Sequence, residues 1–340
     1  MSRTDSLAVL LAQRPVGEVR DEDFRLERRP VDELNDGEIR IRVQWISLDP
    51  YMRPRMNDMK SYMPPIPLGD VMVGESVGEV VESRSTKYQV GDTVCSASGW
   101  QSYFNVSEND PQLTKVDPEI ISPSVYLGAA GMTGRTAYFG LLKVGKPKAG
   151  ETVVVSAAAG AVGSIVGQIA KMQGCRVVGV AGGSKKCTYV EDVLGFDACV
   201  DYKGGALEAD LQAACPAGID VYFENVGGAV TRAVAPLLNS GARVPICGYV
   251  SAYNATDITE VETPMQVFKA LPEPPEHRFF LVTEWQEEYP EVTRQLAQWI
   301  RDGSIQYRET VAAGLENAGQ AFRGMLQGDN LGKQLVKLAD

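Results

Sequence analysis

The sequence predicts an α/β protein with one mainly β domain and one domain built on a doubly wound parallel sheet. A chain of 340 residues normally divides into two domains, because single cores stop growing before that length. Residues before about 120 read as short alternating strands, whereas from Glu151 strands and helices alternate. The change of rhythm therefore marks a change of domain.

The mainly β character rests on two clear alternating segments near the start, Glu38–Val43 and Gly78–Glu82. Each places apolar side chains on one face of a strand and polar side chains on the other. The last forty residues return to short strands. We therefore expect the end of the chain to rejoin the first domain.

The alternating half is expected to form a parallel sheet with helices on both faces. Its predicted elements are strands at 151–157, 175–181, 198–202, 220–225, 243–247 and 279–282, a helix at 161–172, and an amphipathic helix that ends near Arg301.

Composition excludes several classes of function. Lysine and arginine total 33 against 44 acidic residues, a net charge of −11 that would repel nucleic acid and anionic membranes. The six cysteines show no C-x-x-C spacing, and no run of about 18 apolar residues occurs. We expect free thiols, no membrane span and a cytoplasmic protein.

His277 is the only histidine in the chain. Most hydrolase triads, catalytic zinc sites and imidazole bases require at least one histidine. His277 itself follows Pro274-Pro275-Glu276, so it is expected in a solvated polar turn before the strand 279–282. The sequence therefore predicts no metal site and no histidine catalysis.

A dinucleotide-binding fingerprint follows the first strand of the alternating half. Val153-Val154-Val155 runs into Ser156-Ala157-Ala158-Ala159-Gly160-Ala161-Val162-Gly163, which reads A-x-G-x-x-G before a helical pattern. The small residues allow a tight turn close to a pyrophosphate, and the helix N-terminus offers free N–H groups.

The end of the second strand favours NADP over NAD. An acid about 20 residues beyond the fingerprint would bond the ribose 2′-hydroxyl of NAD. Residues 180–186 read Val-Ala-Gly-Gly-Ser-Lys-Lys instead. Lys185 and Lys186 can neutralise a 2′-phosphate.

Four segments together resemble one family along nearly the whole chain: Leu48-Asp49-Pro50-Tyr51-Met52-Arg53, Ser156–Lys171, Tyr222–Gly228, and Gly328-Asp329-Asn330-Leu331-Gly332-Lys333. The chain resembles the zinc-independent branch of the medium-chain dehydrogenase/reductase superfamily, which includes prostaglandin reductases, alkenal double-bond reductases and curcumin reductases. The resemblance implies a Rossmann domain, residues 126–304, inserted in a GroES-like mainly β catalytic domain, residues 1–125 and 305–340.

The resemblance also implies which residues bind NADPH. They are Gly160, Ala161, Val162 and Gly163 for the pyrophosphate, Lys186 and Tyr202 for the 2′-phosphate, and Asn225, Cys247, Gly248, Tyr249, Val250, Ser251, Tyr253, Phe280, Leu281, Val282 and Asn330 for the nicotinamide end. An extra glycine and a lengthened helix between Gly182 and Leu194 leave the 2′-phosphate partner open between Lys185 and Lys186.

The implied reaction is hydride transfer from NADPH to the β-carbon of an α,β-unsaturated ketone or aldehyde. A tyrosine hydroxyl could stabilise the enolate, and the candidates are Tyr253 first, then Tyr51 and Tyr62. Two alternatives stay open: a quinone reductase of the same superfamily and a non-catalytic NADPH-binding protein. The resemblance also implies a homodimer.

Overall fold

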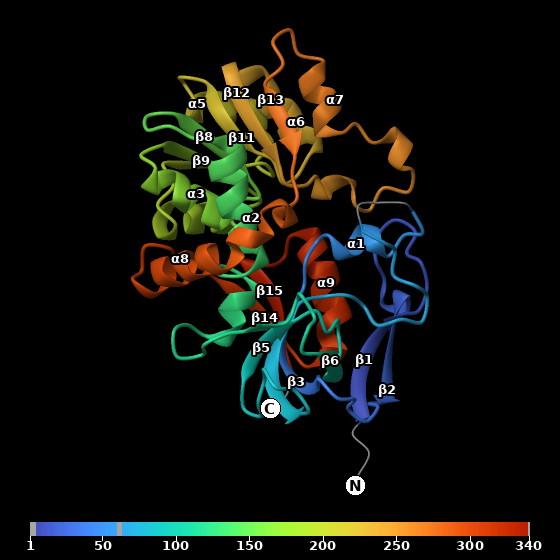
Figure 1. Ribbon diagram of the computed structural model, residues 1–340. Coiled ribbons are helices and arrows are strands. Elements are labelled where there is room, and N and C mark those ends of the chain that lie inside the picture. The colour runs from blue at the N-terminus through green and yellow to red at the C-terminus, as the bar shows by residue number, and fades with distance from the viewer. Residues whose placement is uncertain (1–4, 60–62, 339–340) are drawn as a thin grey trace. The chain divides into compact units, whose positions relative to one another are not determined.

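The computed structural model describes residues 5–59 and 63–338 and divides into two compact units. One unit runs to Gly128 and resumes at Glu309, and the other comprises Ala129–Arg308. Figure 1 shows the chain coloured from its N-terminus to its C-terminus. Among the described residues, no helix combines the length and the apolar character needed to cross a membrane.

The first unit is mainly β. Its larger sheet has the order β14-β15-β3-β4-β5-β7, with β6 also paired to β3, and β1 and β2 form a separate antiparallel pair. The strands are β1 Asp5–Leu11, β2 Phe24–Pro30, β3 Glu38–Ser47, β4 Ser76–Ser83, β5 Thr93–Ser96, β6 Tyr103–Ser107, β7 Thr114–Lys115, β14 Glu309–Ala313 and β15 Lys333–Lys337. The expected strands at 38–43 and 78–82 lie within β3 and β4.

The C-terminal segment contributes more than the expected short strands. Helix α9, Ala318–Gln327, lies between β14 and β15, and α1, Met52–Arg55, follows β3. Phe322 of α9 is fully buried and meets the rings of Phe24 and Trp100 at centroid distances of 6.4 and 5.5 Å. Two glycines and two alanines among its residues hid the helical pattern, which becomes evident once its apolar face meets a core.

The second unit contains a parallel sheet in the order β10-β9-β8-β11-β12-β13. The strands are β8 Thr152–Ser156, β9 Arg176–Ala181, β10 Ala198–Asp201, β11 Ile219–Phe223, β12 Leu238–Ile246 and β13 Glu276–Phe279. Every residue of β8 is buried, as expected of a strand covered on both faces. The order reverses between β8 and β11, which are neighbours despite the intervening β9 and β10.

The helices form two groups: α2 contacts both α3 and α8, and α6 contacts both α5 and α7. Their bounds are α2 Met132–Phe139, α3 Gly163–Met172, α4 Ser184–Thr188, α5 Leu207–Ala214, α6 Gly228–Val234, α7 Pro264–Lys269 and α8 Tyr289–Arg301. Val154 and Tyr222 share a core with α5, α6 and α7, so their neighbours in the strands face the other layer. The predicted fold class, an inserted doubly wound sheet with a mainly β partner, is confirmed.

The last strand differs from its prediction. β13 is Glu276–Phe279, and residues from Val282 form a 3₁₀ turn instead of continuing a strand at 279–282. His277 therefore lies inside β13, where its Nδ1 is 2.9 Å from the carbonyl oxygen of Pro275 and its ring faces Phe268. The expected polar turn was wrong because β13 is the last strand in the order, and an edge strand tolerates polar residues.

Candidate cofactor site

The fingerprint forms a tight turn between β8 and α3. Ala157 has φ of 50°, and the amide of Gly160 donates to the Ala157 carbonyl at 2.9 Å. A Cβ at Gly163 would lie 2.4 Å from that same carbonyl oxygen, so only glycine fits where α3 begins. The turn thus brings the N-terminus of α3 to the carboxyl end of the sheet, where the amides of Ser164 and Ile165 donate to the carbonyls of Gly160 and Val162 at 3.1 Å.

The segments after β9 and β10 meet beside this turn. A Cβ at Gly182 would lie 2.8 Å from the ring of Tyr202, so the glycine lets the two segments approach closely. Tyr202 keeps 43% of its surface exposed, and the Lys203 ammonium lies 5.8 Å from its ring centroid. Lys185 is exposed and Lys186 half-buried at the start of α4. The structure therefore brings the predicted 2′-phosphate residues to one edge of the sheet.

Asp201 ends β10 between these two segments. Its Oδ1 accepts hydrogen bonds from the backbone amides of Gly183 at 2.7 Å and Lys203 at 2.9 Å. These two hydrogen bonds hold the pKa of Asp201 below its usual range. Sequence patterns did not identify Asp201, because its hydrogen-bond donor Gly183 follows a different strand.

Asn225 links the ends of β8 and β11 across the point where the strand order reverses. Its side-chain amide donates to the Ser156 carbonyl at 2.7 Å, and its backbone amide donates to Ser156 Oγ at 2.8 Å. Open α/β sheets bind ligands at such a reversal. Asn225 is therefore fixed at the edge where a dinucleotide would cross.

Glu224, the residue before Asn225, is a fully buried carboxylate. Its Oε1 accepts from the amides of Val226 at 2.8 Å and Gly227 at 2.9 Å, and Thr231 Oγ1 donates to its Oε2. Burial raises its pKa, and these donors oppose that shift. Glu224 was not among the predicted site residues, although it shapes the turn that holds Asn225.

The turn after β12 packs on the same neighbours. The amides of Cys247 and Gly248 donate to the Glu224 carbonyl at 2.9 and 3.2 Å, and the Val250 amide donates to the Asn225 carbonyl at 3.2 Å. Burial raises the pKa of Cys247 to about 12, so it stays a thiol at neutral pH. The predicted segment 247–253 therefore lies against the end of β11.

Tyr253 follows a short 3₁₀ turn, Val250–Ala252. Its ring meets that of Tyr249 edge to face at 6.1 Å, and a Cβ at Gly248 would lie 3.0 Å from its hydroxyl. The glycine thus leaves room for the Tyr253 hydroxyl beside the end of β12. Tyr253 belongs to the same group of loops as the predicted nicotinamide residues.

The residues after β13 divide between core and surface. Phe280 is buried, and its ring lies 6.1 Å from that of Phe223, whereas Leu281 and Val282 are half-buried. The Phe280 side chain is therefore a packing group, and the segment could offer a ligand its main chain and the next two side chains.

Tyr51 and Asn330 lie in the first unit. Tyr51 precedes α1 and packs partly against the core, and Asn330 donates from its side chain to the Gly332 carbonyl at 2.8 Å. The segments that carry them are joined by a buried ion pair: Lys333 Nζ lies 2.5 Å from Asp49 Oδ1. Tyr62, the remaining tyrosine candidate, lies outside the described residues.

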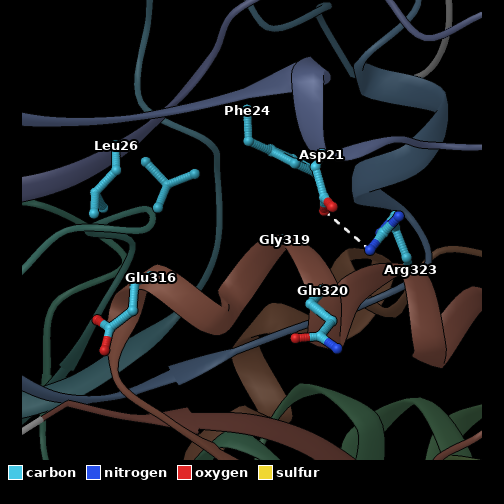
Figure 2. Close-up of a pocket in the computed structure, with 8 residues that line it drawn as sticks. Asp21, Phe24, Leu26, Glu316, Gly319, Gln320 and Arg323 are labelled. Carbon is cyan, nitrogen blue, oxygen red and sulfur yellow. Dashed lines mark ion pairs between the residues drawn. The ribbon is translucent and has the colours of Figure 1, made fainter.

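A surface pocket of about 400 Å³ opens in the first unit between β2 and α9 (Figure 2). Asp21 and Arg323 form an ion pair at 3.0 Å on its wall. Its lining residues are Val9, Asp21, Phe24, Leu26, Glu316, Gly319, Gln320 and Arg323. None of them is a predicted site residue.

Metal ligands do not cluster in residues 5–59 and 63–338: no group of three His, Cys, Asp or Glu side chains could hold an ion. None of the cysteines in this part forms a disulfide.

A fingerprint turn and five further loops at the carboxyl edge of a six-stranded parallel sheet define a dinucleotide-dependent oxidoreductase. Two family models match the chain, "N-terminal domain of oxidoreductase" over residues 8–116 and "Zinc-binding dehydrogenase" over residues 161–298. The chain belongs to the zinc-independent medium-chain dehydrogenase/reductases, together with the curcumin and prostaglandin reductases.

The sequence relatives cover almost the whole chain. The NADPH-dependent curcumin reductase of Escherichia coli (strain K12) is 47% identical over 97% of this chain and 96% of its own length. Prostaglandin reductase 1 of Bos taurus is 42% identical over 95% and 96%. The family predicted from the sequence is confirmed.

The solved structure of CurA from Vibrio vulnificus in complex with NADPH matches with a TM-score of 0.91 and 44% identity, covering 98% of this chain and 99% of that one. The agreement at this identity extends the family assignment to the three-dimensional fold. The roles of individual residues stay predictions.

Proposed function

We propose that this NADP-dependent oxidoreductase reduces the conjugated carbon–carbon double bond of α,β-unsaturated ketones and aldehydes with NADPH. The observation that carries the proposal is the convergence of the fingerprint turn, the lysines of α4 and Asn225 on one edge of the parallel sheet. The names of its relatives, a curcumin reductase and a prostaglandin reductase, support enone-type substrates.

The proposed cofactor contacts follow the order of the strand ends. Residues 160–163 bind the pyrophosphate, Lys186 and Tyr202 bind the 2′-phosphate, and Asn225, 247–253 and 280–282 bind the nicotinamide end. Asn330, in the other unit, is assigned to the nicotinamide end by the family resemblance alone. Bound NADPH supplies the hydride. The protein positions the cofactor: Gly163 and Asn225 fix the loops on either side of the reversal in strand order.

The Tyr253 hydroxyl is our first choice to donate a hydrogen bond to the enolate oxygen that develops on the substrate, with Tyr51 and Tyr62 as alternatives. A phenol is a neutral donor, so it can act here without a metal or an imidazole. Space for the hydroxyl beside Gly248 supports this choice.

The test is turnover of purified protein with NADPH and a panel of a 2-alkenal, a conjugated aryl ketone and a quinone. Enone turnover that prefers NADPH to NADH and ignores a chelator would support the proposal, whereas quinone-only turnover would indicate a quinone reductase. NADPH binding without any turnover would indicate a non-catalytic binding protein.

The tyrosine assignment predicts that Tyr253→Phe lowers kcat about a hundredfold, the usual effect of losing one donor to a developing oxyanion. The matched control is Tyr88→Phe, which removes a hydroxyl that donates to the Leu113 carbonyl in the other unit. Full activity of Tyr253→Phe would transfer the role to Tyr51 or Tyr62.

We further infer that the mainly β unit is the catalytic domain and that the protein acts as a homodimer in the cytoplasm. Elution as a particle of 36.8 kDa would contradict the dimer.

A further inference from the structure

Asp201 joins two loops that the chain keeps 18 residues apart. One carboxylate oxygen, Oδ1, accepts from the Gly183 amide in the segment after β9 and from the Lys203 amide in the segment after β10. The two acceptor distances, 2.7 and 2.9 Å, are those of well-formed hydrogen bonds. This atom therefore joins the two segments, beside a backbone hydrogen bond from the Tyr202 amide to the Ala181 carbonyl at 3.1 Å.

Each segment carries side chains that could face the same ligand. Gly183, with φ of 92°, leads directly into Ser184, Lys185 and Lys186. Tyr202 and Lys203 follow Asp201 and are both exposed. The approach of Tyr202 to Gly182 shows that the two segments are in contact.

A carboxylate here needs a structural reason, because its charge would repel a phosphate placed nearby. Asp201 is not remote from the proposed 2′-phosphate site, since it lies directly before Tyr202 in the chain. Two backbone amides donate to Oδ1 and partly compensate the charge. The carboxylate serves the two loops rather than a ribose hydroxyl.

We propose that Asp201 is a positioning residue for cofactor selectivity, which holds Tyr202 and Lys203 opposite Lys185 and Lys186 so that both pairs reach one 2′-phosphate. The proposal rests on the proposed use of NADPH. It adds Lys203 to the groups around that phosphate and gives Asp201 an indirect role that needs no contact with the cofactor.

The test compares Asp201→Ala with Asp201→Asn in the full-length protein. Asparagine keeps an Oδ1 that can accept from both amides and removes only the charge, whereas alanine removes the acceptor. The readouts are the Kd values for NADPH and NADH from quenching of intrinsic fluorescence. A merely structural defect would raise the Kd values for both cofactors equally.

We expect Asp201→Ala to raise the Kd for NADPH about tenfold, the effect of losing hydrogen bonds that order a charged site. The Kd for NADH should change less than about twofold. Asp201→Asn should bind NADPH at least as tightly as the wild type. Equal losses for both cofactors in Asp201→Ala, or an Asp201→Asn variant as weak as Asp201→Ala, would overturn the proposal.

Asp201→Ser provides a second variant if alanine prevents folding. Serine can still accept from the Lys203 amide two residues ahead, but its shorter side chain loses Gly183. We expect Asp201→Ser to lose its preference for NADPH as Asp201→Ala does. A retained preference would contradict the proposed positioning role of Asp201. A wild type that binds NADPH no better than NADH would instead refute the proposed function, so the two failures are distinguishable.

Discussion

Each unit buries one carboxylate near its predicted site residues, and the two are stabilised differently. In the mainly β unit, Asp49 pairs with the ammonium of Lys333 and accepts from Ser47 Oγ. In the unit with the parallel sheet, the hydrogen-bond donors to Glu224 are amides and hydroxyls, foremost Thr231. Both carboxylates are shielded from water, with 2% and 0% of their surface exposed.

The difference lies in what each carboxylate connects. Asp49 and Lys333 are 284 residues apart, so their ion pair joins the first and last segments of one unit. Two of the donors to Glu224 are the amides two and three residues ahead, so this carboxylate shapes a local turn. An opposite charge joins distant segments, and neutral donors order a nearby loop.

The largest effect is expected from Lys333→Met, which leaves the Asp49 charge buried without its cation. Breaking one side of a buried pair typically costs about 3–5 kcal/mol. Urea unfolding measures the loss. The double variant Asp49→Asn/Lys333→Met removes both charges and should regain part of the stability, and a single variant as stable as the wild type would show that the pair contributes nothing.

A smaller loss of stability, about 2–3 kcal/mol, is expected from Glu224→Ala. The substitution leaves the amides of Val226 and Gly227 without their hydrogen-bond acceptor. Glu224→Gln keeps an acceptor oxygen and the side-chain volume, and it should lose less than half as much. Thermal unfolding of both variants measures the difference. Equal losses would mean that the negative charge, and not the acceptor, holds the turn.

The smallest effect is a pH dependence. Because burial raises the pKa of Glu224, the folded state keeps a proton that the unfolded state releases, so this group's contribution to stability falls as pH rises above the ordinary glutamate range. Glutamine does not titrate. The wild-type free energy of unfolding minus that of Glu224→Gln should therefore decrease from acidic to neutral pH, and parallel curves would contradict the shift.

Local sequence predicted the fold wherever a segment's pattern is complete by itself. The apolar run of β8, the small residues of the turn and Gly163 specify strand, turn and helix within twelve residues or so, and the structure places all three as expected. The strand β13 was predicted three residues too late, and α9 was missed, because edge position and a partner core decide them.

The unpredicted site residues depend on pairs that sequence spacing does not indicate. Glu224 lies 68 residues from Ser156, and the contact exists only because β8 and β11 are neighbours. Asp201 likewise reaches Gly183 only because β9 and β10 are parallel partners. The motif Asp49-Pro50-Tyr51 and Lys333 drew attention as family motifs, but their direct pairing is visible only in three dimensions.

The return of the chain to its first sheet has a consequence for folding during synthesis. Residues 129–308 leave the ribosome as one uninterrupted segment, so their unit can fold before translation ends. The other unit must wait for β15, whose residues 335–337 pair with Trp45–Ser47 of β3. Until then those three residues present an open strand edge, a template for association with other chains. The mainly β unit is therefore the part whose yield should depend most on chaperones.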